Sequence, residues 1–442
     1  MGVGAVAEPL AVVTLLFGGA WFNRTTAADS NAKVASYTQL ENTRKRFDDY
    51  AHRRSGSESS DTPPSVDWAS TSGTLSPQEE NDRWRNRRIK AFKYDRMVQT
   101  PNTIIFKDRL LSRLLRKFPF LVEAWYWALI YWVVNAGSKI QVYQLGRAFT
   151  AVTLVEGTVD VARKHALQLI HIEQALGVFI ERPIQDWFLA RPLLMLWTNR
   201  IYSFIHIPGT IFFLVMLYFV TTTRRRRSLV RSGGTDTSLF GNGGPVLYEA
   251  RRRTMALCNL IAFVVFTLWP CMPPRLLSDP DYKGDNAAEA KSFGFVDTVH
   301  SADGEKSVWT ANKFCNQYAA MPSLHFGYSL LIGLTIATFP VSGLRPTSWK
   351  RWVIVLLGMS YPATILAAIV ATANHFVLDA VAGALVCGIA WHANGVLLNL
   401  LVVEDYFLWA LRIHKPVNWT DPETAVDGGF RGVMSHELAQ EV

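Results

Sequence analysis

The apolar run from Phe376 to Val403 constrains this chain most, because it is long enough to cross a bilayer as a helix. His375 precedes the run, and Asp379 and Gly383 follow at i+4 and i+8, so the three residues share one helix face. An aspartate near the start of a membrane helix is costly and normally has a partner. The ring of His375 is the obvious one, because a carboxylate on one imidazole nitrogen makes the other more basic, as a nucleophile or general base requires. A structural His–Asp pair that caps a helix is the alternative.

A second motif lies some fifty residues upstream, where Pro322, Ser323 and His325 open another apolar run. Pro322 suits the first turn of a helix, and the free amides there, with the Ser323 hydroxyl, are suited to hold an anion. One further apolar span, 352–373, separates the two motifs. Two crossings return the chain to the side it left, so we expect His325 and His375 to face the same aqueous compartment.

These two motifs resemble signatures of a known family. Met-Pro-Ser-Leu-His at 321–325 and Asn-His-Phe-Val-Leu-Asp-Ala-Val-Ala-Gly at 374–383 are similar to the second and third motifs of the type 2 phosphatidic acid phosphatase and haloperoxidase superfamily. Leu324 stands where the phosphatases usually have Gly, which is more similar to the branch containing fungal inositolphosphorylceramide synthase. The resemblance covers about residues 165–403. It implies an all-α, polytopic membrane helix bundle with a six-helix phosphatase-type core.

The resemblance also implies a role for each polar residue of the motifs. His375 attacks phosphorus and forms a phosphohistidine, Asp379 orients it, His325 protonates the leaving oxygen, and Ser323 helps to bind the phosphoryl oxygens. We expect no metal and no cofactor, because a nucleophile and acid pair needs none. A metal site built from His325, His375 and Asp379 is the alternative.

The chain departs from the family pattern at two cationic positions. The usual first motif, a Lys seven residues before an Arg-Pro pair, is absent, and Ile369 stands where the third motif usually has an Arg. A phosphoryl group in its transition state needs such donors. Arg275, which ends the helix before the second motif, is the first candidate to replace them. Lys313, in the following loop, is the second.

Three further polar residues, Glu173, Glu181 and Gln185, lie in a segment that also looks like the inositolphosphotransferase branch. Two interpretations stay open for them. They bind substrate, or they pair structurally with Arg182.

The composition is typical of a membrane protein. Of the 442 residues 49% are hydrophobic, and the charges gather in blocks between apolar runs. The net charge of +9 is explained by basic cytoplasmic loops, because arginines sit at the ends of apolar spans. We therefore expect the bilayer as a partner and no nucleic acid, and the resemblance implies lipid substrates in addition.

The predicted organisation has four parts. They are a membrane helix at 1–22, a polar and largely disordered cytoplasmic region at 23–106, a membrane catalytic domain at 107–403 and a cytoplasmic tail at 404–442.

Over the whole chain the sequence predicts about six to seven spans, with the motifs on the luminal side of the Golgi or endoplasmic reticulum. Residues 137–190 are interpreted as helices at the non-cytoplasmic surface or as a re-entrant element. The basic, leucine-bearing stretch Lys107–Lys117 is predicted to lie on cytoplasmic headgroups. Cys271 and Cys315 flank the luminal loop, where a disulfide and two free thiols are both open.

Three classes of function compete. The first is a phosphoryl-transfer enzyme for lipid phosphates, which moves phosphoinositol from phosphatidylinositol to a ceramide-like acceptor or, if water is the acceptor, acts as a phosphatase. The second is a transporter whose intramembrane His and Asp carry protons. The third is a non-catalytic membrane protein. The polar residues cluster at helix mouths instead of running through several spans, which favours the enzyme over the transporter. Within the enzyme class we favour the transferase on the resemblance of Leu324 and the segment 173–185 to the inositolphosphotransferase branch.

Overall fold

The computed structural model describes residues 4–26, 83–91, 93–127, 129, 158–202, 206–224, 227, 243–284, 286–298, 319–341, 343–345 and 347–415. Within these residues the chain is mostly helical, with one two-stranded sheet. It divides into two units, and each is described by itself. The first unit comprises 1–22, 122–221 and 247–397, and the second comprises 23–121, 222–246 and 398–442.

Three helical segments of the described chain are long and apolar enough to cross a membrane. They are His206–Thr223, Trp349–Ala371 and Val377–Leu411, and two shorter apolar helices are Pro9–Phe22 and Leu324–Thr338. The three segments overlap the apolar runs 201–220, 352–373 and 376–403, which the sequence predicts as spans, and they indicate an integral membrane protein. The predicted total of six to seven spans draws on residues 130–157, which lie outside the described part.

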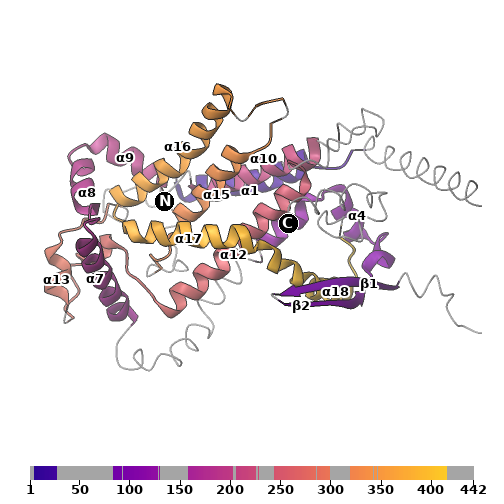
Figure 1. Cartoon of the computed structure of the whole chain (residues 1–442), viewed down its shortest axis with the longest axis horizontal. Coiled ribbons are helices and arrows are strands. Elements are labelled where there is room, and N and C mark those ends of the chain that lie inside the picture. The colour runs from indigo at the N-terminus through magenta and orange to yellow at the C-terminus, as the bar shows by residue number, and fades with distance from the viewer. Residues whose placement is uncertain are drawn as a thin grey trace, which may run out of the picture. The chain divides into compact units, whose positions relative to one another are not determined.

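Three helices that carry or flank the two motifs lie together in the first unit. α15 (Leu324–Thr338) packs against both α16 (Trp349–Ala371) and α17 (Val377–Ala393) (Figure 1). Ser323 is the N-cap of α15, so Pro322 precedes the helix instead of lying in its first turn as expected. The apolar run after α17 continues through a 3-10 stretch, η7 (Asn394–Leu400).

Glycines allow α15 and α17 to touch through their backbones close to their N-termini. A Cβ built on Gly383 would overlap the carbonyl oxygen of Ser323, and one on Gly327 would lie 3.1 Å from the carbonyl oxygen of Gly383. The backbone N–H of Ser323 donates to the carbonyl of Asp379 at 2.9 Å. Small residues permit such an approach between membrane helices. The two motif-bearing helices therefore meet where their functional side chains begin.

The first unit also holds, wholly or for the most part, the remaining helices of the membrane domain. They are α1 (Gly4–Phe22), α7 (Thr158–Leu176), α8 (Glu181–Leu189), α9 (Pro192–Arg200), α10 (His206–Tyr218), η4 (Phe219–Thr223), α12 (Pro245–Leu268), η6 (Pro274–Leu276) and α13 (Ala287–Ser292). Ala166 and Ile170 of α7 are fully buried in one cluster with Met272 and Phe376. α7 therefore supports the segment that leads into α17.

The arginines that were expected to bound a cytoplasmic loop lie inside α12. Arg252 pairs with Glu123 at 2.7 Å, and the guanidinium carbon of Arg251 lies 3.2 Å from the ring centroid of Trp391. Arg253 donates to the side chain of Asn394 at 3.3 Å. Because these side chains have partners within the first unit, they extend the helix instead of ending it.

The second unit contains an antiparallel hairpin that the sequence did not predict. β1 (Trp84–Ala91) pairs with β2 (Tyr94–Pro101), in the register that places Ala91 opposite Tyr94. Residues 23–106 were predicted to be polar and largely disordered, and the hairpin occupies the end of that range. Its strands are rich in arginine and lack the apolar alternation by which strands are recognised.

An aspartate from the C-terminal part of the chain explains why this hairpin has a defined structure. Asp405 of α18 (Leu401–Leu411) accepts from Arg87 at 2.6 and 2.9 Å and from the Thr100 hydroxyl at 2.7 Å. All three side chains are buried. A buried charge pair with additional hydrogen bonds fixes one geometry. The first residues of the predicted 404–442 tail thus belong to a helix, and residues 416–442 lie outside the described part.

The second unit also carries η1 (Thr103–Phe106) and α4 (Leu110–Lys117), which cover the predicted amphipathic stretch. Leu110, Leu111 and Leu114 are exposed. Residues 83–117 contain twelve Lys and Arg against two Asp. An apolar helix surface among so many cations matches the predicted placement on membrane headgroups.

Reversing three α4 charges, by Arg113→Glu, Arg116→Glu and Lys117→Glu, is expected to release α4 from anionic bilayers. Amide exchange of residues 104–117 measured in nanodiscs with and without phosphatidylserine checks this expectation. Protection should appear with the anionic lipid and vanish in the variant, because the cations bind the headgroups. Equal exchange in both lipids would show that α4 makes no such contact.

Gly383→Ala is expected to lower the phosphoryl-transfer activity that the two motifs predict at least roughly 10-fold, since the new methyl group forces α17 away from Ser323 and overpacking costs about 1–3 kcal/mol. Gly388→Ala is the matched control on the same helix, because a Cβ there meets nothing within 4 Å. Turnover and thermal unfolding of both variants in detergent test the prediction. Equal activity of the two variants would contradict it.

Candidate active site

His375 lies in the turn between α16 and α17 and is 5% exposed. Its Nδ1 is 2.8 Å from the carbonyl oxygen of Ala320, and its Nε2 is 3.3 Å from Nδ1 of His325. A carbonyl oxygen can only accept, so Nδ1 carries the proton and Nε2 presents its lone pair. The structure thus brings the two predicted histidines together and holds one of them as the Nε2-basic tautomer.

Asp379 lies beside His375 but does not hydrogen-bond its ring. The Asp379 Oδ2 atom is 3.6 Å from His375 Nδ1 and accepts from the backbone N–H of Phe376 at 2.9 Å. The carboxylate therefore acts on the imidazole through space and caps α17 directly. The carbonyl of Ala320, which no side-chain pattern reveals, holds the ring.

His325 begins α15 and contacts two aromatic residues that the sequence analysis missed. Its ring centroid is 4.7 Å from that of Tyr202 and 4.8 Å from that of His206. His206 Nδ1 is in turn 3.1 Å from the Tyr361 hydroxyl of α16. The signal was available, because an ionisable residue inside an apolar span is a candidate for function by default.

Ser323 is fully buried and uses its side chain as a cap. Its hydroxyl oxygen accepts from the backbone N–H of Phe326 at 3.4 Å. The hydroxyl hydrogen remains available to donate. Ser323 is thus placed between the two motif helices, one residue before the start of α15.

Arg275 lies next to the turn that carries His375. It belongs to η6 and not, as was predicted, to the end of the preceding helix, because α12 ends at Leu268. Its Nε donates to Asn374 at 2.8 Å, its Nη1 pairs with Asp297 at 2.8 Å, and its backbone N–H donates to Ala373. Ile369, at the family's arginine position, is fully buried, and its carbonyl accepts from the Asn374 N–H at 2.9 Å. Lys313, the second candidate cation, lies outside the described residues.

Glu173 and Glu181 do not pair with Arg182. Glu173 accepts from the backbone N–H of Leu378 at 2.8 Å, and Glu181 accepts from that of Val377 at 2.7 Å. Arg182 pairs with Asp186 at 2.7 Å. Both glutamates are fully buried, so two helices upstream of the motifs send carboxylates to the first amides of α17.

Gln185, unlike Glu173 and Glu181, does not bind the N-terminus of α17. Its amide nitrogen donates to the carbonyl of Val296 at 2.8 Å, and its amide oxygen accepts from the N–H of Val296 at 3.1 Å. It also accepts from Arg182 at 3.4 Å. Gln185 therefore ties α8 to the segment that carries Asp297.

Burial shifts two acidic groups beside the turn. It raises the pKa of Glu173 to about 9, and the neighbouring carboxylate of Glu181 adds to the shift. Burial also raises the pKa of the Cys271 thiol, with smaller effects of Asp379 and Glu173. Cys271 is a buried free thiol, and its predicted neighbour Cys315 lies outside the described residues.

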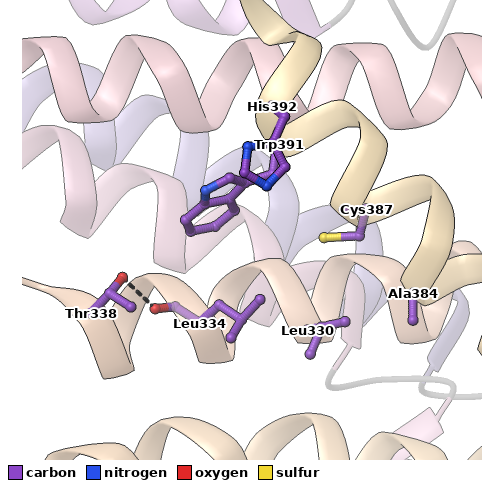
Figure 2. Close-up of a pocket in the computed structure, with 8 residues that line it drawn as sticks. Leu330, Leu334, Thr338, Ala384, Cys387, Trp391 and His392 are labelled. Carbon is purple, nitrogen blue, oxygen red and sulfur yellow. Dashed lines mark hydrogen bonds between the residues drawn. The ribbon is translucent and has the colours of Figure 1, made fainter. Parts of the chain in front are cut away.

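Two other features of the described residues bear on the chemistry. They contain no group of three or more His, Cys, Asp and Glu arranged to hold a metal ion. A cavity of about 310 Å³ opens between the second halves of α15 and α17 (Figure 2). Its lining consists of Leu330, Leu334, Thr338, Ala384, Cys387, Gly388, Trp391 and His392. None of these is a catalytic candidate, so the candidate active site is the group of side chains around His375 and His325 and not this cavity.

A helical membrane protein with a buried histidine pair at the mouths of two adjoining helices is suited to covalent group transfer. The sequence profile of the PAP2 superfamily matches residues 167–241 and 242–393, which is more than half of the chain. The chain therefore belongs to the PAP2 superfamily, whose members are typically metal-independent phosphatases and phosphotransferases, and membership implies lipid phosphates as substrates. Searches of curated proteins and of solved structures each gave no significant match.

His206→Phe is expected to lower kcat roughly 10-fold or more with little change in KM. The substitution keeps a ring beside His325 but removes the link to Tyr361, so the ring of His325, the predicted acid, is held less well. Tyr361→Phe, which removes only the hydroxyl, should reproduce part of the loss. Steady-state kinetics of both variants test this, and wild-type kcat in His206→Phe would contradict it.

Proposed function

We propose that this protein is a membrane-embedded phosphotransferase for lipid phosphates, with His375 as the covalent nucleophile and His325 as the acid and base. One observation carries the proposal: the hydrogen bond from His375 Nδ1 to Ala320 leaves the Nε2 lone pair directed at His325. A neutral imidazole with a free Nε2 lone pair attacks without the help of a base, and His325 beside it, in its protonated form, is placed to donate a proton to the leaving oxygen.

In the first step the Nε2 lone pair of His375 attacks phosphorus. The bond between phosphorus and the oxygen of the leaving alcohol breaks, and that oxygen takes a proton from His325. The two rings must separate for this step, because 3.3 Å between their nitrogens leaves no room for a phosphoryl group. The products are a phosphohistidine, a free alcohol and a neutral His325.

In the second step His325 accepts a proton from the acceptor hydroxyl. The acceptor oxygen attacks phosphorus, the phosphorus–nitrogen bond breaks, and both histidines return to their starting states. A lipid hydroxyl as acceptor gives a transferase, and water gives a phosphatase. Arg275, Ser323 and Lys313 are proposed to bind the phosphoryl oxygens, with Asp379 supporting the imidazolium of His375 through space.

The donor that we propose is phosphatidylinositol, with a ceramide-like alcohol as acceptor. Leu324 and the segment 173–185 support this assignment by their similarity to the inositolphosphotransferase branch. Charge supports it too. Ile369 replaces a family cation, and Arg275 is paired with Asp297. A phosphodiester carries one negative charge, whereas a phosphomonoester approaches two at neutral pH, so a site with fewer free cations favours the diester.

The alternative within the same chemistry is a lipid phosphate phosphatase, which uses water in the second step. The alternative from another class is a transporter or another non-catalytic membrane protein. A proton-coupled transporter requires polar groups along several spans, whereas the candidate residues gather at the N-termini of α15 and α17.

The test uses the full-length protein in detergent with a chelator present. Phosphatidylinositol or phosphatidic acid, labelled in the phosphate, is supplied with and without ceramide. Label in a ceramide product identifies the transferase, water-soluble label identifies a phosphatase, and no turnover of either donor contradicts the proposal. Chelator should leave the activity unchanged, since the mechanism needs no metal.

His375→Ala is expected to abolish turnover, because no other described group takes the place of Nε2. Asp379→Asn should weaken turnover without abolishing it, since Asp379 supports the ring across 3.6 Å and an amide oxygen still accepts from Phe376. The same labelled assay compares the two variants. Equal residual activity in both would refute the assigned roles.

A further inference from the structure

We infer that Glu173 and Glu181 share one proton and act as positioning residues for His375, by capping the helix that follows it. The inference rests on the proposed function, in which His375 is the nucleophile. It assigns to the two glutamates a role other than substrate binding.

The N-terminus of α17 has an unusual cap. The first amides of a helix lack partners within the helix, and one side chain normally satisfies one or two of them. Here three consecutive amides, those of Phe376, Val377 and Leu378, each donate to a different carboxylate. Asp379 comes from α17 itself, Glu181 from α8 and Glu173 from α7. All three carboxylates are fully buried.

The N-terminus of α17 cannot stabilise three ionised carboxylates. A helix N-terminus contributes about half a positive charge, and a buried carboxylate without a counter-charge is costly. The second oxygens, Glu173 Oε2, Glu181 Oε2 and Asp379 Oδ1, are buried without a hydrogen-bond partner among the described residues. A proton between the two glutamates removes one charge and gives one of these oxygens a partner, as in other carboxyl pairs.

The surroundings of the pair agree with a shared proton. Asp379 and the Cys271 thiol are the other acidic groups close to Glu173, and His375 faces Asp379 across 3.6 Å. The pKa of Glu173, raised to about 9 by burial and by Glu181, keeps it protonated at neutral pH. The geometry of the cap and the charge of its neighbours thus lead to the same conclusion.

The cap acts on the nucleophile through the backbone. The capped amides begin one residue after His375, and Phe376 is buried against Ala166 and Ile170 of α7. α7 and α8 therefore fix the turn that aims the imidazole at Ala320 and His325. The same bonds occupy amides that a substrate phosphate would otherwise use. The phosphoryl group must be held by other donors, such as Arg275.

Infrared spectroscopy of the full-length protein tests the shared proton without reference to activity. The carbonyl band of a protonated carboxylic acid should be present at neutral pH, titrate with a midpoint near 9 and be lost in Glu173→Gln. Glu289→Gln is the matched control, because Glu289 is an exposed carboxylate paired with His171. A spectrum in which Glu173→Gln removes no such band would overturn the proton sharing.

Thermal unfolding gives a second measure. A carboxyl whose pKa is raised in the folded protein binds more protons there than in the unfolded chain, between about pH 4.5 and 9. Its contribution to stability is full below that window and is lost as the pH rises through it. The melting temperature of the wild type should therefore fall toward pH 9 relative to Glu173→Gln. Parallel curves for the two proteins would overturn the inference.

Kinetics test the positioning role. Glu173→Ala leaves the Leu378 amide without its acceptor and should lower kcat up to roughly 100-fold with little change in KM, since a small misplacement of a nucleophile is costly. Glu173→Gln should rescue most of this loss, because its amide accepts from Leu378 and donates to Glu181. Wild-type kcat in Glu173→Ala overturns the positioning role. A wild type that turns over no lipid phosphate, but shows the expected infrared band, refutes the proposed function and leaves the proton sharing intact.

Discussion

The backbone contact between α15 and α17 is the constraint on which the candidate site depends. Gly327 and Gly383 let the two helices meet at the residues where the motifs begin, and the N–H of Ser323 binds the carbonyl of Asp379 across the contact. His325 and His375 are fifty residues apart in the chain, yet their rings lie 5.4 Å apart between centroids. Their distance is set by the first turn of α15 and by the short turn that leads into α17, and the contact between the two helices holds both turns together.

Buried charge in the first unit is handled in two ways. Arg252 with Glu123 and Arg275 with Asp297 are neutralised by ion pairs, which compensate the cost of removing both charges from water. The carboxylates at the N-terminus of α17 have amides instead of cations as partners. Amides offer only partial charges, so the proposed proton between Glu173 and Glu181 takes the place of a cation.

The sequence predicted the parts of the site that local spacing determines. The two apolar helices that follow the motifs appear in the structure as expected. His375 and Asp379 lie close together, but His375 precedes α17 instead of sharing a helix face with Asp379, and the carboxylate does not hold the ring as predicted. The cap could not be predicted, because Glu181 and Val377 are 196 residues apart and no periodicity links them. The same holds for the hairpin, whose buried pair of Arg87 and Asp405 joins residues 318 apart. The importance of His206 could have been predicted, because it is an ionisable residue inside a predicted span.

The cap also bears on which substrate the site accepts. A phosphorus atom bonded to Nε2 of His375 brings anionic oxygens toward a turn that already faces Asp379, at 3.6 Å from the ring. Like charges repel, and low dielectric strengthens the repulsion. A proton held by Glu173 and Glu181 lowers the negative charge at the N-terminus of α17 by one. A phosphodiester donor also brings less negative charge to Nε2 of His375 than a phosphomonoester does. The two effects act in the same direction, so the proposed proton sharing agrees with the proposed phosphodiester donor.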